Sequence, residues 1–82
     1  MTIVFAVRGD HIQLDQLLKT TGLCHSGGFA HAEIAAGKVL VDGGLETRKR
    51  AKLRPGQQVV YGGETITLCA DEAQTDVDAP PD

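Results

Sequence analysis

The stretch HSGGFAHAEIAAGKVLVDGG, residues 25–44, decides the fold because the spacing of its apolar residues changes halfway along. In the first half, Ala30 and Ile34 lie one helical turn apart, after Ser26 as an N-cap candidate and before Gly37 as the residue that ends the helix. In the second half, apolar side chains alternate with a period of two, and the DGG at 42–44 is typical of a tight hairpin turn. The stretch therefore predicts a helix followed by a β-hairpin.

Strand and helix patterns flank this stretch. The segment TIVFAVR at 2–8 is rich in β-branched and aromatic residues and predicts a first strand. Leucines at helical spacing after it predict a first helix, which either has a capping box formed by Asp10 and Gln13 or begins nearer Gln13. Beyond the hairpin, turns at 55–56 and 62–63 delimit further strands. The expected fold class is α+β, with two N-terminal helices packed on a small, mainly antiparallel β-sheet.

Length and composition restrict the class of protein. The 82 residues fit one small domain. There is no apolar run long enough to span a membrane, and the N-terminal residues do not resemble a secretory signal. Two cysteines, Cys24 and Cys69, are too few for a disulfide scaffold. We therefore expect a cytoplasmic protein, and we expect a monomer.

The charge is distributed unevenly along the chain. The formal net charge is −3, but residues 1–70 alone carry a net charge of +2 and residues 71–82 a net charge of −5. Val77 is the one large apolar residue after position 70, so this segment has little to bury. The expected organisation is a folded domain at 1–70 and a disordered acidic tail at 71–82.

Five cations occur within seven residues, which is unusual in an acidic chain: Arg48, Lys49, Arg50, Lys52 and Arg54. If this segment is an extended strand, its four even-numbered cations lie on one side at intervals of about 6.5–7 Å, close to the spacing of nucleic-acid phosphates. A solvated edge strand that blocks aggregation is the alternative. Because three of the five are arginines, which suit bidentate phosphate contacts, the pattern favours phosphate binding.

Other candidate sites lie at the start of the second predicted helix. Ser26, Gly27 and Gly28 could present backbone N–H groups to an anion, although an ordinary helix cap explains them as well. Phe29 flanks the apolar stripe, and we expect it at the edge of the core rather than as a platform for base stacking. The spacing of Cys24, His25 and His31 fits no zinc motif. We therefore predict no metal, no cofactor and no catalytic residue.

Residues 12–60 resemble the alpha-L RNA-binding motif found in a small-subunit ribosomal protein, and more narrowly the short YbcJ-like bacterial proteins. The resemblance rests on the helix residues, the glycines and the hairpin together. The matching positions are Leu14, Asp15, Leu17, Leu18, Lys19, Ser26, Gly27, Gly28, Ala30, Ile34, Gly37, Val39, Val41, Asp42, Gly43, Glu46, Thr47, Arg48, Lys52, Leu53, Pro55 and Gly56.

This resemblance implies a non-enzymatic domain that binds structured RNA, often ribosomal, through the two helices and the hairpin. It adds Lys19 and His31 to the candidate RNA contacts. Two positions depart from the family pattern: His31 stands where lysine is typical, and Asp42 where asparagine is usual. Both reduce the positive charge of the expected surface. A protein–protein adaptor whose basic strand docks an acidic partner is the alternative function.

Overall fold

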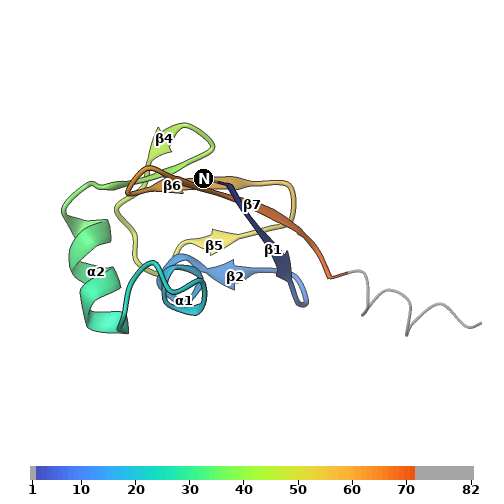
Figure 1. Ribbon diagram of the computed structural model, residues 1–82, viewed down its shortest axis with the longest axis horizontal. Coiled ribbons are helices and arrows are strands. Elements are labelled where there is room, and N and C mark those ends of the chain that lie inside the picture. The colour runs from blue at the N-terminus through green and yellow to red at the C-terminus, as the bar shows by residue number, and fades with distance from the viewer. Residues whose placement is uncertain (1, 72–82) are drawn as a thin grey trace, which may run out of the picture.

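The computed structural model describes residues 2–71, which contain two helices and seven strands (Figure 1). In chain order these are β1 (Thr2–Val7), β2 (Ile12–Gln13), α1 (Leu14–Thr20), α2 (Gly27–Ala35), β3 (Val39–Val41), β4 (Gly44–Leu45), β5 (Lys52–Leu53), β6 (Gln58–Tyr61) and β7 (Glu64–Ala70).

The strands form two sheets. Five of them pair in the order β1-β7-β6-β3-β4, where β1 runs parallel to β7 and every other pairing is antiparallel. The remaining two, β2 and β5, form a separate antiparallel pair. Both helices lie on the same side of the larger sheet (Figure 1). The predicted α+β class and the mainly antiparallel sheet are confirmed.

One hydrophobic core joins the helices to both sheets. Its fully buried members include Leu17 from α1, Ile34 from α2, Leu53 from β5 and Ile66 from β7. These four side chains are at most 1% exposed, so truncating any of them to alanine removes buried apolar area and leaves a cavity. Such changes typically destabilise a domain by about 2–5 kcal/mol.

The second helix begins and ends where its sequence predicts. The Ser26 hydroxyl accepts a hydrogen bond from the backbone N–H of Phe29 at 3.1 Å, which makes Ser26 the N-cap. Gly37 follows the helix with a φ of +78°, a left-handed conformation that glycine adopts at low cost. The predicted α2 is confirmed at both ends.

The capping box considered for the first helix is absent, and the alternative, a start near Gln13, is confirmed. Gln13, rather than Asp10, is the N-cap of α1, and its side chain makes no capping hydrogen bond. Instead the backbone N–H groups of Leu14 and Asp15 donate to carbonyl groups of the segment between β4 and β5. A contact between residues so distant in sequence leaves no local pattern from which it could have been predicted.

The hairpin turn is confirmed, but the strand expected after it is not continuous. Asp42 and Gly43 have φ values of +51° and +83°, as a tight two-residue turn requires. The returning strand β4 ends at Leu45, and the next strand, β5, pairs with β2 instead of extending the hairpin. Residues 46–51 therefore leave the larger sheet as an irregular connection.

The described chain ends beside the end of β1. Asp71 donates its backbone N–H to the carbonyl of Val7 at 3.1 Å and accepts a hydrogen bond from Arg8 Nε at 3.1 Å. The rest of the predicted acidic tail, residues 72–82, lies outside the described residues. Within residues 2–71, neither helix is long and apolar enough to cross a membrane.

Candidate nucleic-acid interface

The basic segment, residues 48–54, is exposed at each of its five cations: Arg48, Lys49, Arg50, Lys52 and Arg54. A turn opens it, in which the N–H of Ala51 donates to the carbonyl of Arg48 at 3.2 Å. Arg48, Arg50, Ala51 and Lys52 surround a hollow of about 410 Å³. Three of the cations therefore line one open hollow.

This geometry corrects the predicted ladder of evenly spaced cations. Alternation holds only from Ala51 to Arg54, where Ala51 and Leu53 are buried while Lys52 and Arg54 are exposed. A continuous strand would have placed Lys49 on the side opposite the four even-numbered cations, but Lys49 lies in the exposed turn. The pattern failed because a turn interrupts the strand, so the cations curve around a hollow instead of standing in a row.

The basic segment is held against the start of α1. The N–H of Leu14 donates to the carbonyl of Ala51, and the N–H of Asp15 donates to the carbonyl of Lys49, both at 3.0 Å. The first N–H groups of a helix have no partner inside the helix, so these two bonds satisfy donors that would otherwise need water. The turn that carries the cations is thus fixed to a helix end.

His31 connects the second helix to the same place. Its Nε2 lies 2.7 Å from Oδ2 of Asp15, and both side chains are partly buried, with exposed fractions of 35% and 16%. The predicted candidate His31 therefore lies near the basic segment, one contact removed from Lys49. Its hydrogen-bond partner is the carboxylate of Asp15, so its direct part here is to join α2 to α1.

Glu46 partly neutralises the first cation of the basic segment. The Nε and Nη2 atoms of Arg48 donate to the two Glu46 carboxylate oxygens at 3.0 and 3.2 Å, and the Arg48 N–H also donates to Oε2 at 3.0 Å. These bonds lower the pKa of the Glu46 carboxyl, chiefly through the Arg48 side chain. Arg48 is thereby oriented, and much of its charge is balanced.

Asp42, which departs from the family pattern, has a structural explanation. Its Oδ2 accepts a hydrogen bond from Gln57 Nε2 and its Oδ1 one from the N–H of Gln58, each at 3.0 Å. Gln57 in turn accepts a bond from the N–H of Arg54 through Oε1 at 2.7 Å. The bond from Gln57 is the main reason that the pKa of Asp42 is lowered. The carboxylate thus ties the hairpin turn to the end of the basic segment.

The remaining predicted contacts lie on the helices. Lys19 is exposed and follows Asp15 by one turn, so it lies on the same side of α1 as the link to His31. Gly27 and Gly28 form the first turn of α2, and a Cβ atom added to either would meet no atom within 4 Å. Packing within this chain therefore does not explain why these positions are glycine.

Phe29 does not occupy the edge of the core as predicted. Its side chain is exposed, at 38%, and its ring stacks on that of His25 with the ring centroids 4.7 Å apart. The apolar stripe of α2 is narrow, with Ala30 and Ile34 as its buried residues, and Phe29 falls outside it. Periodicity could have indicated this, because Phe29 precedes Ala30 by one position and Ile34 by five, and neither spacing is the three or four that places residues on one helix face.

A buried cluster between α2 and β6 escaped the sequence analysis. The Tyr61 hydroxyl donates to Glu33 Oε1 at 2.7 Å, which lowers the pKa of that carboxyl and raises the pKa of Tyr61. Burial raises the pKa of the nearby Cys24 thiol, so Cys24 stays protonated and is a poor nucleophile. Across residues 2–71, His, Cys, Asp and Glu side chains form no group of three that could hold a metal ion.

Comparison with known proteins gives consistent results. A family model described as the S4 domain matches residues 5–69. The chain is 45% identical over 60 residues to the "Putative RNA-binding protein YbcJ" of Escherichia coli (strain K12), across 73% of this chain and 86% of that protein. An "Uncharacterized protein YbcJ" of Shigella flexneri matches to the same extent, at 45% identity over 60 residues.

A solved structure agrees with these matches. The solution structure of Escherichia coli YbcJ, whose title describes an alpha-L motif involved in RNA binding, superposes with a TM-score of 0.62 at 40% sequence identity. The match covers 84% of this chain and 86% of that one. The resemblance noted from the sequence is therefore confirmed, and the chain belongs to the S4 domain family.

Proposed function

We propose that this protein is a small, non-enzymatic RNA-binding module of the cytoplasm, which acts as a monomer and binds structured RNA on the basic segment. Ribosomal RNA is the first candidate ligand. The observation that carries the proposal is the open hollow of about 410 Å³ that Arg48, Arg50 and Lys52 line together with Ala51. Convergent cations around one concavity suit a phosphate group, which three separate surface charges would hold less well.

Rigid support strengthens this proposal. Two backbone hydrogen bonds to α1 hold the turn that carries Lys49 and Arg50, so little order has to be gained when RNA binds. Lys49 and Arg54 extend the positive surface on either side, and Lys19 adds a cation on α1. The start of α2 would contribute backbone donors from Gly27 and Gly28, where open space lets a phosphate approach.

The test is a binding titration with a ribosomal RNA fragment at several salt concentrations, in which fluorescence anisotropy measures the affinity. If three to five phosphates are neutralised, the logarithm of the affinity should fall with the logarithm of salt at a slope of about −2 to −4. Arg50→Gln should lower the affinity and reduce the steepness of that slope by about one unit. A flat salt titration would contradict the proposal.

Lys38→Gln is the matched control, because it removes the same charge from an exposed lysine outside the basic segment. Its effect on RNA affinity should be much smaller than that of Arg50→Gln. Polyglutamate serves as a second ligand that carries charge but no bases. If polyglutamate binds as tightly as RNA under the same conditions, the adaptor function, in which the basic segment docks an acidic protein, is the better explanation.

A further inference from the structure

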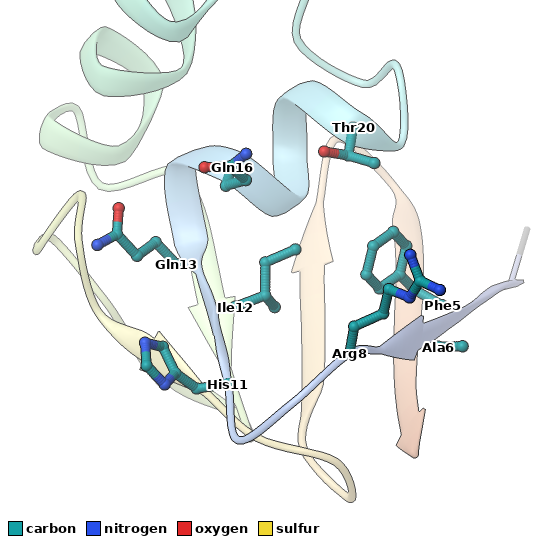
Figure 2. Close-up of a pocket in the computed structure, with 8 residues that line it drawn as sticks. All are labelled: Phe5, Ala6, Arg8, His11, Ile12, Gln13, Gln16 and Thr20. Carbon is teal, nitrogen blue, oxygen red and sulfur yellow. The ribbon is translucent and has the colours of Figure 1, made fainter. Parts of the chain in front are cut away.

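A second hollow, of about 360 Å³, lies between β1, β2 and α1. Its wall is shared with the basic segment, because β2 pairs with β5 and Gln13 lies opposite Lys52. Figure 2 shows Arg8 and Phe5 at one end of this hollow, Gln13 at the other, and Ile12 between them. The volume lies near the lower end of the range for small-ligand sites.

The floor of this hollow is apolar. Phe5 and Ile12 pack against the hydrophobic core but remain partly exposed, and their outer surfaces face the hollow. Ala6 continues this surface along β1. A flat, hydrophobic ligand would cover side-chain area that is now in contact with water, which favours binding of an aromatic ring.

The rim is polar and able both to donate and to accept hydrogen bonds. Gln13 and Gln16 supply amide groups, and Thr20 supplies a hydroxyl. Arg8 donates from Nε to Asp71 at 3.1 Å, which holds a guanidinium group at the rim although its side chain is 85% exposed. Among the described residues that line the hollow there is no carboxylate.

We propose that this hollow binds one unpaired nucleobase of the RNA that the basic segment holds, a proposal that rests on the function proposed above. A nucleobase has two flat apolar faces and an edge that carries both donors and acceptors. The floor of Phe5 and Ile12 fits the faces, and the amides of Gln13 and Gln16 fit the edge. Arg8 is then available to the sugar–phosphate chain of the same nucleotide.

The first test uses single nucleotides and the ¹H–¹⁵N spectrum of the full chain. Each of the four nucleoside 5′-monophosphates is added in turn, with ribose 5-phosphate as the control that has the phosphate but no base. At least one nucleotide should move the side-chain amide signals of Gln13 and Gln16, whereas ribose 5-phosphate should leave them unchanged. If no nucleotide moves them, or if ribose 5-phosphate moves them equally, the proposal is overturned.

The second test compares two hairpin RNAs that differ at one bulged nucleotide, which has its base in one and is abasic in the other. The double change Gln13→Ala and Gln16→Ala should weaken binding of the base-bearing RNA roughly fivefold. The same double change should leave the affinity for the abasic RNA unchanged. Gln13 makes no side-chain capping bond in α1, so the variant should fold. Equal losses for both RNAs would overturn the proposal.

Gln58→Ala is the matched control, because it removes an exposed glutamine on β6 that lies outside the hollow. It should leave the affinity for both RNAs unchanged. If the function proposed above is itself wrong, the outcome is different, because adding either hairpin RNA then leaves the amide signals of residues 48–54 in place. The nucleotide titration still decides in that case whether the hollow accepts a base.

Discussion

Nε2 of His31 lies 2.7 Å from Oδ2 of Asp15, and this contact joins α2 to the residue whose N–H donates to Lys49 in the basic segment. His31→Ala should therefore lower the stability of the fold, and any effect on RNA binding should be indirect. We expect the free energy of unfolding to fall by about 1 kcal/mol, as for one partly buried hydrogen bond. Denaturant unfolding measures this loss.

The same variant should move the amide signals of residues 48–51 in the protein without RNA, because Asp15 is no longer held. Lys19→Ala is the control, since Lys19 lies one turn further along α1 and is exposed. It should leave those signals in place. If His31→Ala does not move them either, the link between α2 and the basic segment has no influence on the shape of that segment.

A second prediction concerns Glu46, which balances the charge of Arg48 through two hydrogen bonds between their side chains. Glu46→Gln removes one negative charge beside the hollow of the basic segment, while its amide oxygen can still accept the bond from the Arg48 backbone. RNA affinity should rise about threefold near 0.1 M salt and return toward wild type at high salt, where charges are screened. Anisotropy titrations at two salt concentrations measure both effects.

Asp10→Asn is the matched control for Glu46→Gln, because it removes a carboxylate that is exposed before β2. Its effect on affinity should be smaller at every salt concentration. A decrease in affinity for Glu46→Gln would mean that orienting Arg48 matters more than the charge that Glu46 cancels.

A third prediction separates stability from binding at the start of α2. Gly27→Ala and Gly28→Ala meet no atom within 4 Å, so neither should clash within the protein. Each should raise the free energy of unfolding by roughly 0.5–1 kcal/mol, because alanine has less conformational freedom to lose than glycine. If phosphates approach these amides closely, the added methyl group should weaken RNA binding while the fold becomes more stable.

Ala32→Gly is the control with the opposite change, at an exposed position later in α2. It should lower the free energy of unfolding, and the folded variant should bind RNA with unchanged affinity. The measurements are thermal unfolding and anisotropy on the same preparations. Unchanged affinity for both glycine variants would mean that the glycines at 27 and 28 have no part in RNA binding.

A fourth prediction concerns acid stability. The hydrogen bond from Tyr61 holds the pKa of the Glu33 carboxyl below its usual value of about 4.3. A carboxyl whose pKa is lower in the folded state than in the unfolded state stabilises the fold at pH values above its usual pKa. This stabilisation is lost as the pH falls through the pKa of the folded state. Glu33→Gln should therefore lower the melting temperature more at pH 7 than at about pH 3. Equal decreases at both pH values would contradict this explanation.

The local parts of the fold follow from the sequence, whereas its long-range contacts do not. Ser26, the glycine after α2 and the turn at Asp42 were predicted correctly, because each depends on a few neighbouring residues. The hydrogen bonds at the start of α1 were not predicted, because its first donors bond to Lys49 and Ala51. Cross-chain hydrogen bonds of this kind have no signature in the local pattern.

The basic segment illustrates the same limit at the candidate site. Its charge identified the residues, since five cations in seven positions are evident from the sequence alone. Its shape was predicted as a straight strand. In the structure β5 pairs with β2, and a turn bends the segment just before β5. The hollow between β1 and α1 could not be foreseen either, because its floor and rim come from elements that meet only in the folded chain.

The last prediction concerns residues 72–82, which carry four carboxylates and no cation. Asp71 is bonded to Arg8 and to Val7, so removal of residues 72–82 should leave the described domain intact. The truncated chain has a net charge of +1 instead of −3, and it should bind RNA more tightly, with the gain largest at low salt.

Repulsion between these carboxylates and RNA would suffice for that gain, so affinity alone does not reveal a contact with the domain. Direct competition for the basic segment requires more: truncation must also move the amide signals of residues 48–54 in the protein without RNA. If affinity rises while those signals stay in place, the carboxylates act through their charge at a distance and do not occupy the basic segment.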